Sequence, residues 1–215
     1  MSFRLGLTGG IACGKSTASR AFMSVGIPVI DADVISHALT ALGSPLLDTL
    51  YARFGREIAL EDSSLNRAAL RKIVFSDESR LNALNELMHG AIRRELIAKA
   101  GAALKDAPYV VLAIPLLFEN HLENLVDRIL VLDAPEDVQL QRILRRDGCS
   151  EDTARSIISH QVSREYRLSH GDDIIDTGKL KDADLGARIL KLHAFYLNLS
   201  HEPHHRAPAD VIQQS

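Results

Sequence analysis

A short glycine-rich segment near the N-terminus has the residue types and spacing that bind the phosphates of a nucleotide. The segment reads Gly9-Gly10-Ile11-Ala12-Cys13-Gly14-Lys15-Ser16 and matches the pattern G-x-x-x-x-G-K-[ST] at every position. Glycine tolerates backbone angles that other residues avoid, so successive N–H groups from about Ala12 to Ser16 can turn toward one phosphate. We expect Lys15 to bridge the β- and γ-phosphates and the Ser16 hydroxyl to ligate a nucleotide-bound Mg²⁺ ion. The predicted nucleotide-binding residues of this P-loop are Gly10, Ile11, Ala12, Cys13, Gly14, Lys15, Ser16 and Thr17.

Cys13 has two interpretations. A thiol in an electropositive loop can have a lowered pKa and act as a redox switch. Alternatively, Cys13 is a small loop residue whose backbone N–H matters more than its side chain. Cys13 and Cys149 are the only two cysteines of the chain, too few for a disulfide framework, so we expect reduced thiols and a cytoplasmic location.

A protein that transfers the γ-phosphate of its nucleotide to a hydroxyl needs, besides the P-loop, a base that faces this phosphate. Asp33 follows the β-branched run 27–30, at the carboxyl edge of the expected sheet, where a carboxylate can accept a proton from a substrate hydroxyl. The segment Asp31-Ala32-Asp33 also suits a helix cap, a position in which Asp is common. Position alone leaves both roles open.

Basic side chains suited to a phosphate clamp gather further along the chain. Arg142 precedes Arg145 and Arg146 by three and four residues, so the three share one face of an expected helix. Guanidinium groups fork onto phosphate oxygens and suit a lid, for which the turn at Gly148 is a candidate hinge. A solvated basic helix face is the alternative.

The elements that must position these residues alternate between strands and helices. Apolar runs predict strands at residues 3–8, 27–30, 109–114, 128–132 and 173–175. Helical patterns are found at residues 16–23, 34–39, 135–146, 150–167 and 185–196. The near-continuous apolar strands indicate an α/β fold, a parallel sheet covered by helices on both faces. We expect a single domain over residues 1–200, with a helical insertion at about 43–104 and a flexible tail at 201–215.

Composition and charge exclude several classes of protein. The chain has 215 residues, of which 46% are hydrophobic and 25% charged, so it is neither collagenous nor wholly disordered. Its net charge of −3 offers no broad basic surface for nucleic acid or an anionic membrane. The longest apolar run, residues 109–118, is about half of the ~20 residues that a membrane span needs. We therefore expect a soluble protein with no nucleic-acid or membrane partner.

A phosphate-binding loop does not identify the reaction. The chain lacks the N-K-x-D sequence with which GTP switches read guanine. Asp133 resembles the acidic strand end of a mechanical ATPase, but Ala134-Pro135-Glu136 follows it, which indicates a strand end and a helix start. A small-molecule kinase and a nucleotide-dependent binding switch remain.

The chain resembles the dephospho-coenzyme A kinase family from the first strand to about Leu199. The segments that carry the resemblance are LGLTGGIACGKST, Asp31-Ala32-Asp33, Leu65-Asn66-Arg67 with Val74-Phe75, Pro115-Leu116-Leu117-Phe118-Glu119, Gln139-x-x-Arg142-x-x-x-Arg146-Asp147, residues 161–167 and Asp172-Asp173-Ile174-Ile175-Asp176. The resemblance implies ATP-dependent phosphorylation of the ribose 3′-hydroxyl of dephospho-CoA, the final step of coenzyme A synthesis. It also implies a P-loop kinase core with a helical substrate-binding insertion and a lid at about 140–168.

The same resemblance implies roles for individual residues. Asp33 matches the general base, and Arg142 and Arg146 match lid arginines that contact the nucleotide, with Lys15 and Arg142 joining Asp33 in catalysis. Arg145 matches no motif position. The implied substrate-binding residues are Asp33, Arg67, His89, Glu119 and Arg167. The implied partners are ATP with Mg²⁺ and dephospho-CoA, bound by a monomer or weak homo-oligomer. A kinase of another small hydroxyl compound or nucleoside monophosphate is the nearest alternative.

Three positions depart from the family pattern. Ala12-Cys13 stands where Gly-Ser is usual, a change that backbone N–H binding should tolerate. Gly90 follows His89 in place of a usual proline, so the turn there is expected to be looser. Asp176-Thr177-Gly178 replaces a commoner Asp-Asn-Gly turn.

Overall fold

The computed structural model describes residues 3–75 and 77–201, with Phe75 described by its backbone alone. The chain divides into two compact units. The core unit comprises the described parts of Met1–Ile30 and Lys99–Ser215, and the helical unit comprises those of Asp31–Ala98. The insertion was expected at about 43–104, so the helical unit begins and ends earlier in the chain than that. The expected tail lies outside the described residues, apart from His201.

The core unit is built on a five-stranded parallel sheet with the order β2-β3-β1-β4-β5. Its strands are β1 (Phe3–Gly9), β2 (Val29–Asp31), β3 (Tyr109–Ala113), β4 (Arg128–Asp133) and β5 (Asp173–Asp176). Gly9 pairs with Leu132, and Asp133 with Asp176, so β1, β4 and β5 end at one edge of the sheet. The expected α/β fold is confirmed. β2 starts later than expected because the N–H of Ile27 still bonds to Phe22 O at the end of the first helix.

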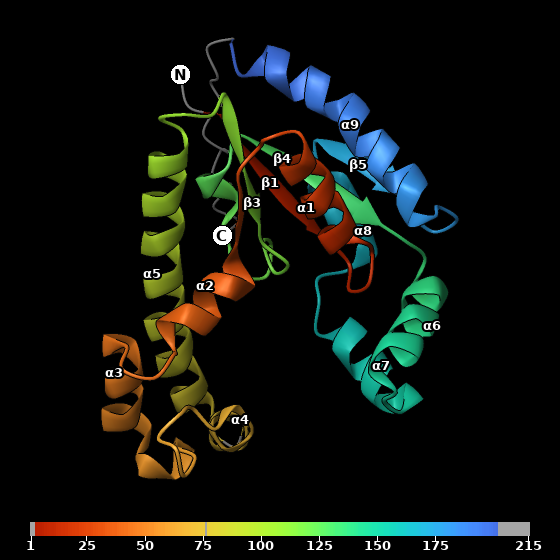
Figure 1. Cartoon of the computed structure of the whole chain (residues 1–215). Helices are drawn as coiled ribbons and strands as arrows, with labels where there is room; N and C mark the ends of the chain where they lie inside the picture. Colours follow the sequence, from red (N-terminus) through yellow and green to blue (C-terminus); the bar gives the residue numbers. More distant parts are fainter. Residues whose placement is uncertain (1–2, 76, 202–215) are drawn as a thin grey trace, which may run out of the picture. The chain divides into compact units, whose positions relative to one another are not determined.

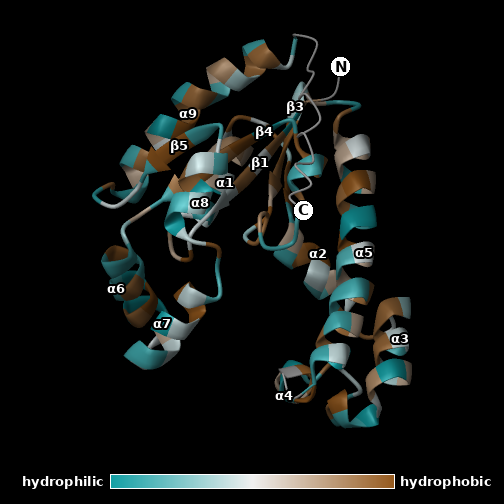
Figure 2. Cartoon of the chain, turned by 180° about the vertical axis from the view of Figure 1, so that it is seen from behind, coloured by the Kyte–Doolittle hydropathy of each residue, from teal (hydrophilic) through white to brown (hydrophobic). Residues whose placement is uncertain are grey.

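Helices cover both faces of this sheet. Helices α1 (Lys15–Ser24) and α9 (Asp182–Leu199) lie together on one face, and the strands between the layers are strongly hydrophobic (Figures 1 and 2). Leu130 and Leu132 of β4 belong to the cluster beneath these helices. Val131 points the other way, against Gly171 at the end of α8 (Arg164–His170). The alternation of buried side chains along β4 therefore accounts for the two helical layers.

The core unit also carries a helical hairpin, α6 (Glu136–Asp147) followed by α7 (Glu151–Ser159). A single polar helix was expected over residues 150–167, but the structure has two helices there, α7 and α8. The break occurs because the Ser163 hydroxyl accepts a hydrogen bond from Tyr166 N and caps a new helix. A short 3₁₀ turn, η2 (Glu123–Leu125), precedes β4.

The helical unit has its own hydrophobic cluster. Its elements are α2 (Ala32–Leu39), α3 (Pro45–Phe54), η1 (Arg56–Ile58), α4 (Arg67–Phe75) and α5 (Glu78–Ala103). Leu47, Leu50 and Phe54 of α3 pack with Leu70 and Val74 of α4. The Ser44 hydroxyl caps α3 by accepting from Leu47 N at 3.2 Å, with Pro45 at the first helical position. Among the helices of the described residues, none is long and apolar enough to cross a bilayer.

Candidate functional site

The P-loop, residues 9–16, joins β1 to α1 through backbone angles that constrain its sequence. Gly9, Ala12 and Gly14 have φ of 147°, 59° and 92°. A Cβ atom on Gly9 would lie 2.1 Å from Leu132 O, and one on Gly10 would lie 2.6 Å from Gln139 Oε1. β4 thus approaches Gly9 too closely for any larger residue, whereas the close contact at Gly10 is with the end of the flexible Gln139 side chain of α6.

The ammonium of Lys15 folds back over the loop. Its Nζ donates hydrogen bonds to Gly9 O at 2.8 Å and Gly10 O at 2.9 Å. Gly14 occupies the N-cap of α1 and has no side chain, so no side chain caps the first turn of the helix there. The N-terminus of a helix attracts anions. Ser16 lies exposed in that turn, and Thr17 accepts a hydrogen bond from Arg20. This arrangement suits a bound anion with a cation beside it.

Cys13 is buried in the core beneath α1 and α9. Burial raises the pKa of its thiol to about 11, and the nearby Lys15 ammonium only partly opposes this. A reactive thiol needs a lowered pKa and access to solvent. The structure therefore favours the interpretation of Cys13 as a packed loop residue over a redox switch.

Arg142 connects α6 to the P-loop. Its Nη1 donates to Ala12 O at 3.2 Å, and its Nη2 donates to Thr177 O at 2.7 Å. Thr177 is itself buried, with its hydroxyl donating to Asp133 O at 2.9 Å. Arg142 thus lies against the loop rather than on a solvated face, and Thr177 ties the turn after β5 to the end of β4.

The other arginines of α6 lie elsewhere. Arg146 forms two hydrogen bonds to its neighbour Asp147, at 2.7 and 2.8 Å. This pairing lowers the pKa of Asp147 and raises that of Arg146. Arg145 is exposed. The structure therefore brings one of the two predicted lid arginines to the P-loop.

Two predicted substrate-binding residues, Glu119 and Arg167, contact a backbone segment instead. We call residues 160–163, between α7 and α8, the connector. Glu119 Oε1 accepts from Val162 N at 2.9 Å, and Arg167, which is only 4% exposed, donates to Val162 O. Next to it, Gln161 Oε1 accepts from Ile11 N at 2.8 Å. The contact of Gln161 with the P-loop was not predicted. The sequence marked Gln161 only as part of residues 161–167, which resemble the family, and this does not indicate what its side chain contacts.

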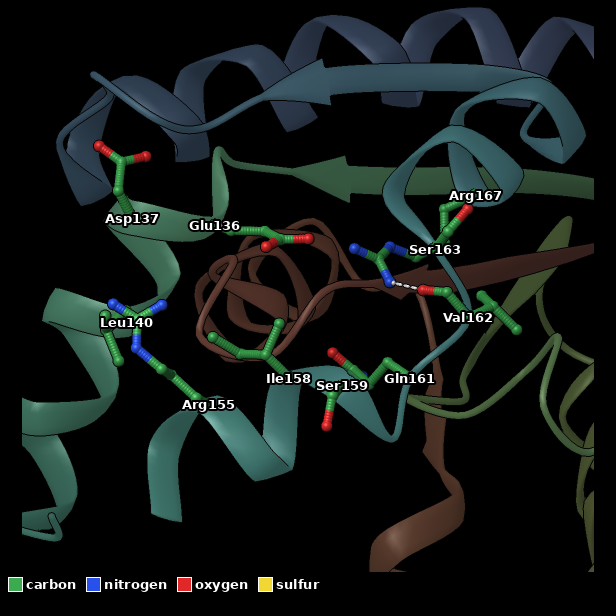
Figure 3. Close-up of a pocket in the computed structure, with 10 residues that line it drawn as sticks. All are labelled: Glu136, Asp137, Leu140, Arg155, Ile158, Ser159, Gln161, Val162, Ser163 and Arg167. Atoms are coloured by element: carbon green, nitrogen blue, oxygen red, sulfur yellow. Dashed lines mark hydrogen bonds between the residues drawn. The ribbon is translucent and has the colours of Figure 1, made fainter. Parts of the chain in front are cut away.

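A cavity of about 570 Å³ adjoins the connector. It lies between α6, α7 and the segment that begins α8 (Figure 3). The residues that line it are Glu136, Asp137, Leu140, Arg155, Ile158, Ser159, Gln161, Val162, Ser163 and Arg167. Its wall carries both arginines and carboxylates, with Arg167 bonded to Val162 at one side (Figure 3).

Asp133 has a structural role. Its side chain is 3% exposed and accepts from Arg164 Nη2 at 2.6 Å and from Arg164 Nε at 3.0 and 3.1 Å. This forked ion pair attaches the first residue of α8 to the end of β4. Asp133, the candidate acidic residue of a mechanical ATPase, is therefore used in an ion pair with Arg164.

The remaining candidate residues lie in the helical unit. Asp31 Oδ1 accepts from Asp33 N at 2.8 Å and from Val34 N at 3.4 Å, so Asp31 is the cap of α2. Asp33 is exposed in the first turn of that helix. Arg67 donates to the Thr40 hydroxyl at 2.7 Å, which links the start of α4 to the end of α2. His89 is half-buried on α5.

Comparison with known proteins gives one consistent result. The family model of dephospho-CoA kinase matches residues 3–182. The dephospho-CoA kinase of Aggregatibacter actinomycetemcomitans is 45% identical over 201 residues, which cover 94% of each chain. A crystal structure of TT1252 from Thermus thermophilus aligns with a TM-score of 0.80 and 29% identity, covering 91% of this chain and 98% of that one. Dephospho-CoA kinase from Campylobacter jejuni aligns with a TM-score of 0.70 and 27% identity, covering 92% and 98%.

Proposed function

Since the chain belongs to the dephospho-CoA kinase family, we propose that Lys15, Arg142 and Asp33 carry out its phosphoryl transfer. The activity of the family is the ATP-dependent phosphorylation of dephospho-CoA, the final step of coenzyme A synthesis. We propose the ribose 3′-hydroxyl as the acceptor. The observation that carries the assignment is the position of the Lys15 ammonium, held across the P-loop by Gly9 O and Gly10 O.

Lys15 exchanges these carbonyl partners for phosphate oxygens when ATP binds. A compact ammonium with three donors can bridge two phosphate groups, while the N–H groups of the loop and of the first turn of α1 surround them. Phosphoryl transfer depends mainly on positioning and on stabilising the charge of the transition state. Lys15 supplies both at the γ-phosphate.

Arg142 supplies the second positive charge. Its guanidinium already lies at the loop, bonded to Ala12 O and Thr177 O, so closure over a phosphate requires only a change of hydrogen-bond partners. Arg146 joins it by exchanging the carboxylate of Asp147 for phosphate oxygens. Two guanidinium groups that replace water around the transferring group stabilise its charge in transit.

Asp33 is the general base for the acceptor hydroxyl. The capping function of the segment is performed by Asp31, which accepts hydrogen bonds from Asp33 N and Val34 N. An exposed carboxylate can accept the hydroxyl proton as the new bond to phosphorus forms. Arg67 and His89 of the helical unit are the proposed contacts to the substrate.

The donor set near the P-loop fits a Mg²⁺ ion held chiefly by phosphates and water. The described residues contain no group of three or more His, Cys, Asp or Glu side chains that could form a protein cage. Mg²⁺ commonly takes only one or two protein ligands at such sites, and Ser16 can supply a hydroxyl oxygen. The bound ion would neutralise part of the phosphate charge.

We also place the enzyme in the cytoplasm. Cys13 and Cys149 are both free thiols, as expected in a reducing compartment. A monomer or weak homo-oligomer is the proposed working form.

A coupled ADP-release assay tests the proposal. With ATP and Mg²⁺, we expect rapid ADP release with dephospho-CoA and little with nucleoside monophosphates. Faster release with a nucleoside monophosphate would assign the enzyme to another acceptor. Tight ATP binding with no release for any acceptor would indicate a nucleotide-dependent binding switch.

A further inference from the structure

The connector between α7 and α8 touches the P-loop through one side chain. Gln161 Oε1 accepts the hydrogen bond of Ile11 N at 2.8 Å, across 150 residues of sequence. Ile11 is half-buried, and a backbone N–H in such a place needs an acceptor. Gln161 supplies one that is neutral, so it adds no negative charge beside the phosphates.

The α6–α7 hairpin also contacts the next residue of the P-loop, Ala12, through Arg142. Arg142 of α6 donates to Ala12 O at 3.2 Å, while Gln161, just after α7, accepts from Ile11 N. Between these two hydrogen bonds Ala12 takes a left-handed conformation, with φ of 59°. Non-glycine residues adopt this conformation only where neighbouring contacts enforce it. The two bonds flank the strained position and act on adjacent residues.

The backbone that carries Gln161 is itself held firmly. Both polar backbone groups of Val162 are bonded to charged side chains, its N–H to Glu119 and its carbonyl to the buried Arg167. The following helix is capped by Ser163 and attached to β4 by the ion pair of Arg164 with Asp133. A side chain whose backbone is supported in this way can fix the position of its hydrogen-bond partner.

We propose that Gln161 is a positioning residue for ATP, with Glu119 and Arg167 acting through Val162 to hold it in place. Its side-chain oxygen fixes Ile11 N and thereby the turn at Ala12, where the phosphate-binding N–H groups begin. The inference rests on the P-loop binding the phosphates of ATP. It assigns Gln161 an effect on ATP and none on the acceptor.

Two variants and a matched control test this role in the full-length protein. Gln161→Met keeps the volume but removes the acceptor. Gln161→Asn keeps the amide but shortens the side chain by one methylene, so it no longer reaches Ile11 N. His160→Ala is the control, because His160 is the exposed neighbouring residue and its ring Nδ1 bonds to Ser156 O of α7.

Steady-state kinetics and amide hydrogen exchange give the readouts. We expect both Gln161 variants to raise the KM for ATP about three- to tenfold, because one neutral hydrogen bond is lost. The KM for dephospho-CoA should stay within about twofold of wild type. The Ile11 amide should exchange faster in both variants and unchanged in the control. An equal rise in both KM values, an unchanged KM for ATP, or unchanged exchange at Ile11 in either folded variant would overturn the inference. Turnover of dephospho-CoA by the wild-type protein tests the proposed function separately. If the wild type turns over dephospho-CoA, a negative result with the Gln161 variants overturns only the role of Gln161.

Discussion

The guanidinium of Arg142 donates a hydrogen bond to Ala12 O, which attaches helix α6 to the P-loop across 130 residues of sequence. The same side chain bonds to Thr177, in the turn after β5. One arginine therefore joins the ends of β1 and β5 to the α6–α7 hairpin. Because Arg142 already lies at the P-loop, it can bind a phosphate by changing hydrogen-bond partners.

We expect Arg142→Ala to lower kcat by about 10²–10³, because a charge that stabilises the transition state is lost. Arg142→Lys should recover little of this, since an ammonium cannot fork onto two oxygens. Steady-state ADP release measures the effect. Arg145→Ala is the matched control, since Arg145 is exposed on the same helix and should keep nearly full activity. Full activity in Arg142→Ala would exclude the clamp.

Asp33→Asn should lower kcat far more than it weakens ATP binding. The amide cannot accept the hydroxyl proton, while the P-loop that binds ATP is unchanged. Single-turnover rates and a separate ATP titration distinguish the two effects. Asp48→Asn is the control, because Asp48 is an exposed carboxylate in the first turn of α3 in the same unit. Near-normal turnover in Asp33→Asn would remove this residue from the mechanism.

Ala12→Gly should stabilise the protein. Ala12 has φ of 59°, and a left-handed conformation costs a non-glycine residue about 1–2 kcal/mol, partly offset by the greater freedom of glycine in the unfolded chain. We expect a net gain of about 0.5–1 kcal/mol, which raises Tm by about 1–4 °C in a chain of this size. Thermal denaturation measures it. Ala21→Gly, inside α1, should be destabilising, and a lower Tm in Ala12→Gly would contradict the argument.

The Cys13 thiol should resist alkylation at neutral pH. Its pKa is raised to about 11 by burial, so only about one molecule in 10³ carries the thiolate at pH 8. The labelling rate should rise about tenfold per pH unit and level off near pH 11, provided the fold is retained. Iodoacetamide labelling followed by peptide mass analysis checks this, with the half-buried Cys149 as internal comparison. Equal labelling of both cysteines at pH 8 would contradict it.

Arg164→Ala should be strongly destabilising. It leaves the Asp133 side chain, which is 3% exposed, without the partner that forks onto it. Removing one member of a buried pair costs about 3–5 kcal/mol, and the partial exposure of Arg164 places the expected loss near the lower value, about 3 kcal/mol. Urea denaturation gives the value. Arg155→Ala breaks the exposed pair of α7 with Glu151 and should cost about 0.5 kcal/mol or less. Similar losses in the two variants would refute the structural role of Asp133.

Much of the fold could be predicted from local pattern. The P-loop, the strand before it and the helix after it lie within residues 3–24, and their signals are the spacing of glycines and the alternation of apolar side chains. The long apolar runs of β3 and β4 indicated a sheet covered on both faces. The single helix expected at 150–167 was wrong because helical periodicity continues across the connector. The Ser163 cap, a local hydrogen bond, starts a second helix, α8, there.

The sequence by itself determined the phosphate-binding loop, the α/β class and, through its motifs, the family. Only the tertiary structure decided which side chain meets which distant backbone: Arg142 with Thr177 O, Glu119 with Val162 N, and Gln161 with Ile11 N. It also distinguished the two aspartates at the start of α2, with Asp31 as the cap. The physical reason is range. Backbone propensity and periodicity act over a few consecutive residues. The hydrogen bonds of Arg142, Glu119 and Gln161 depend instead on where distant segments lie after the sheet has formed.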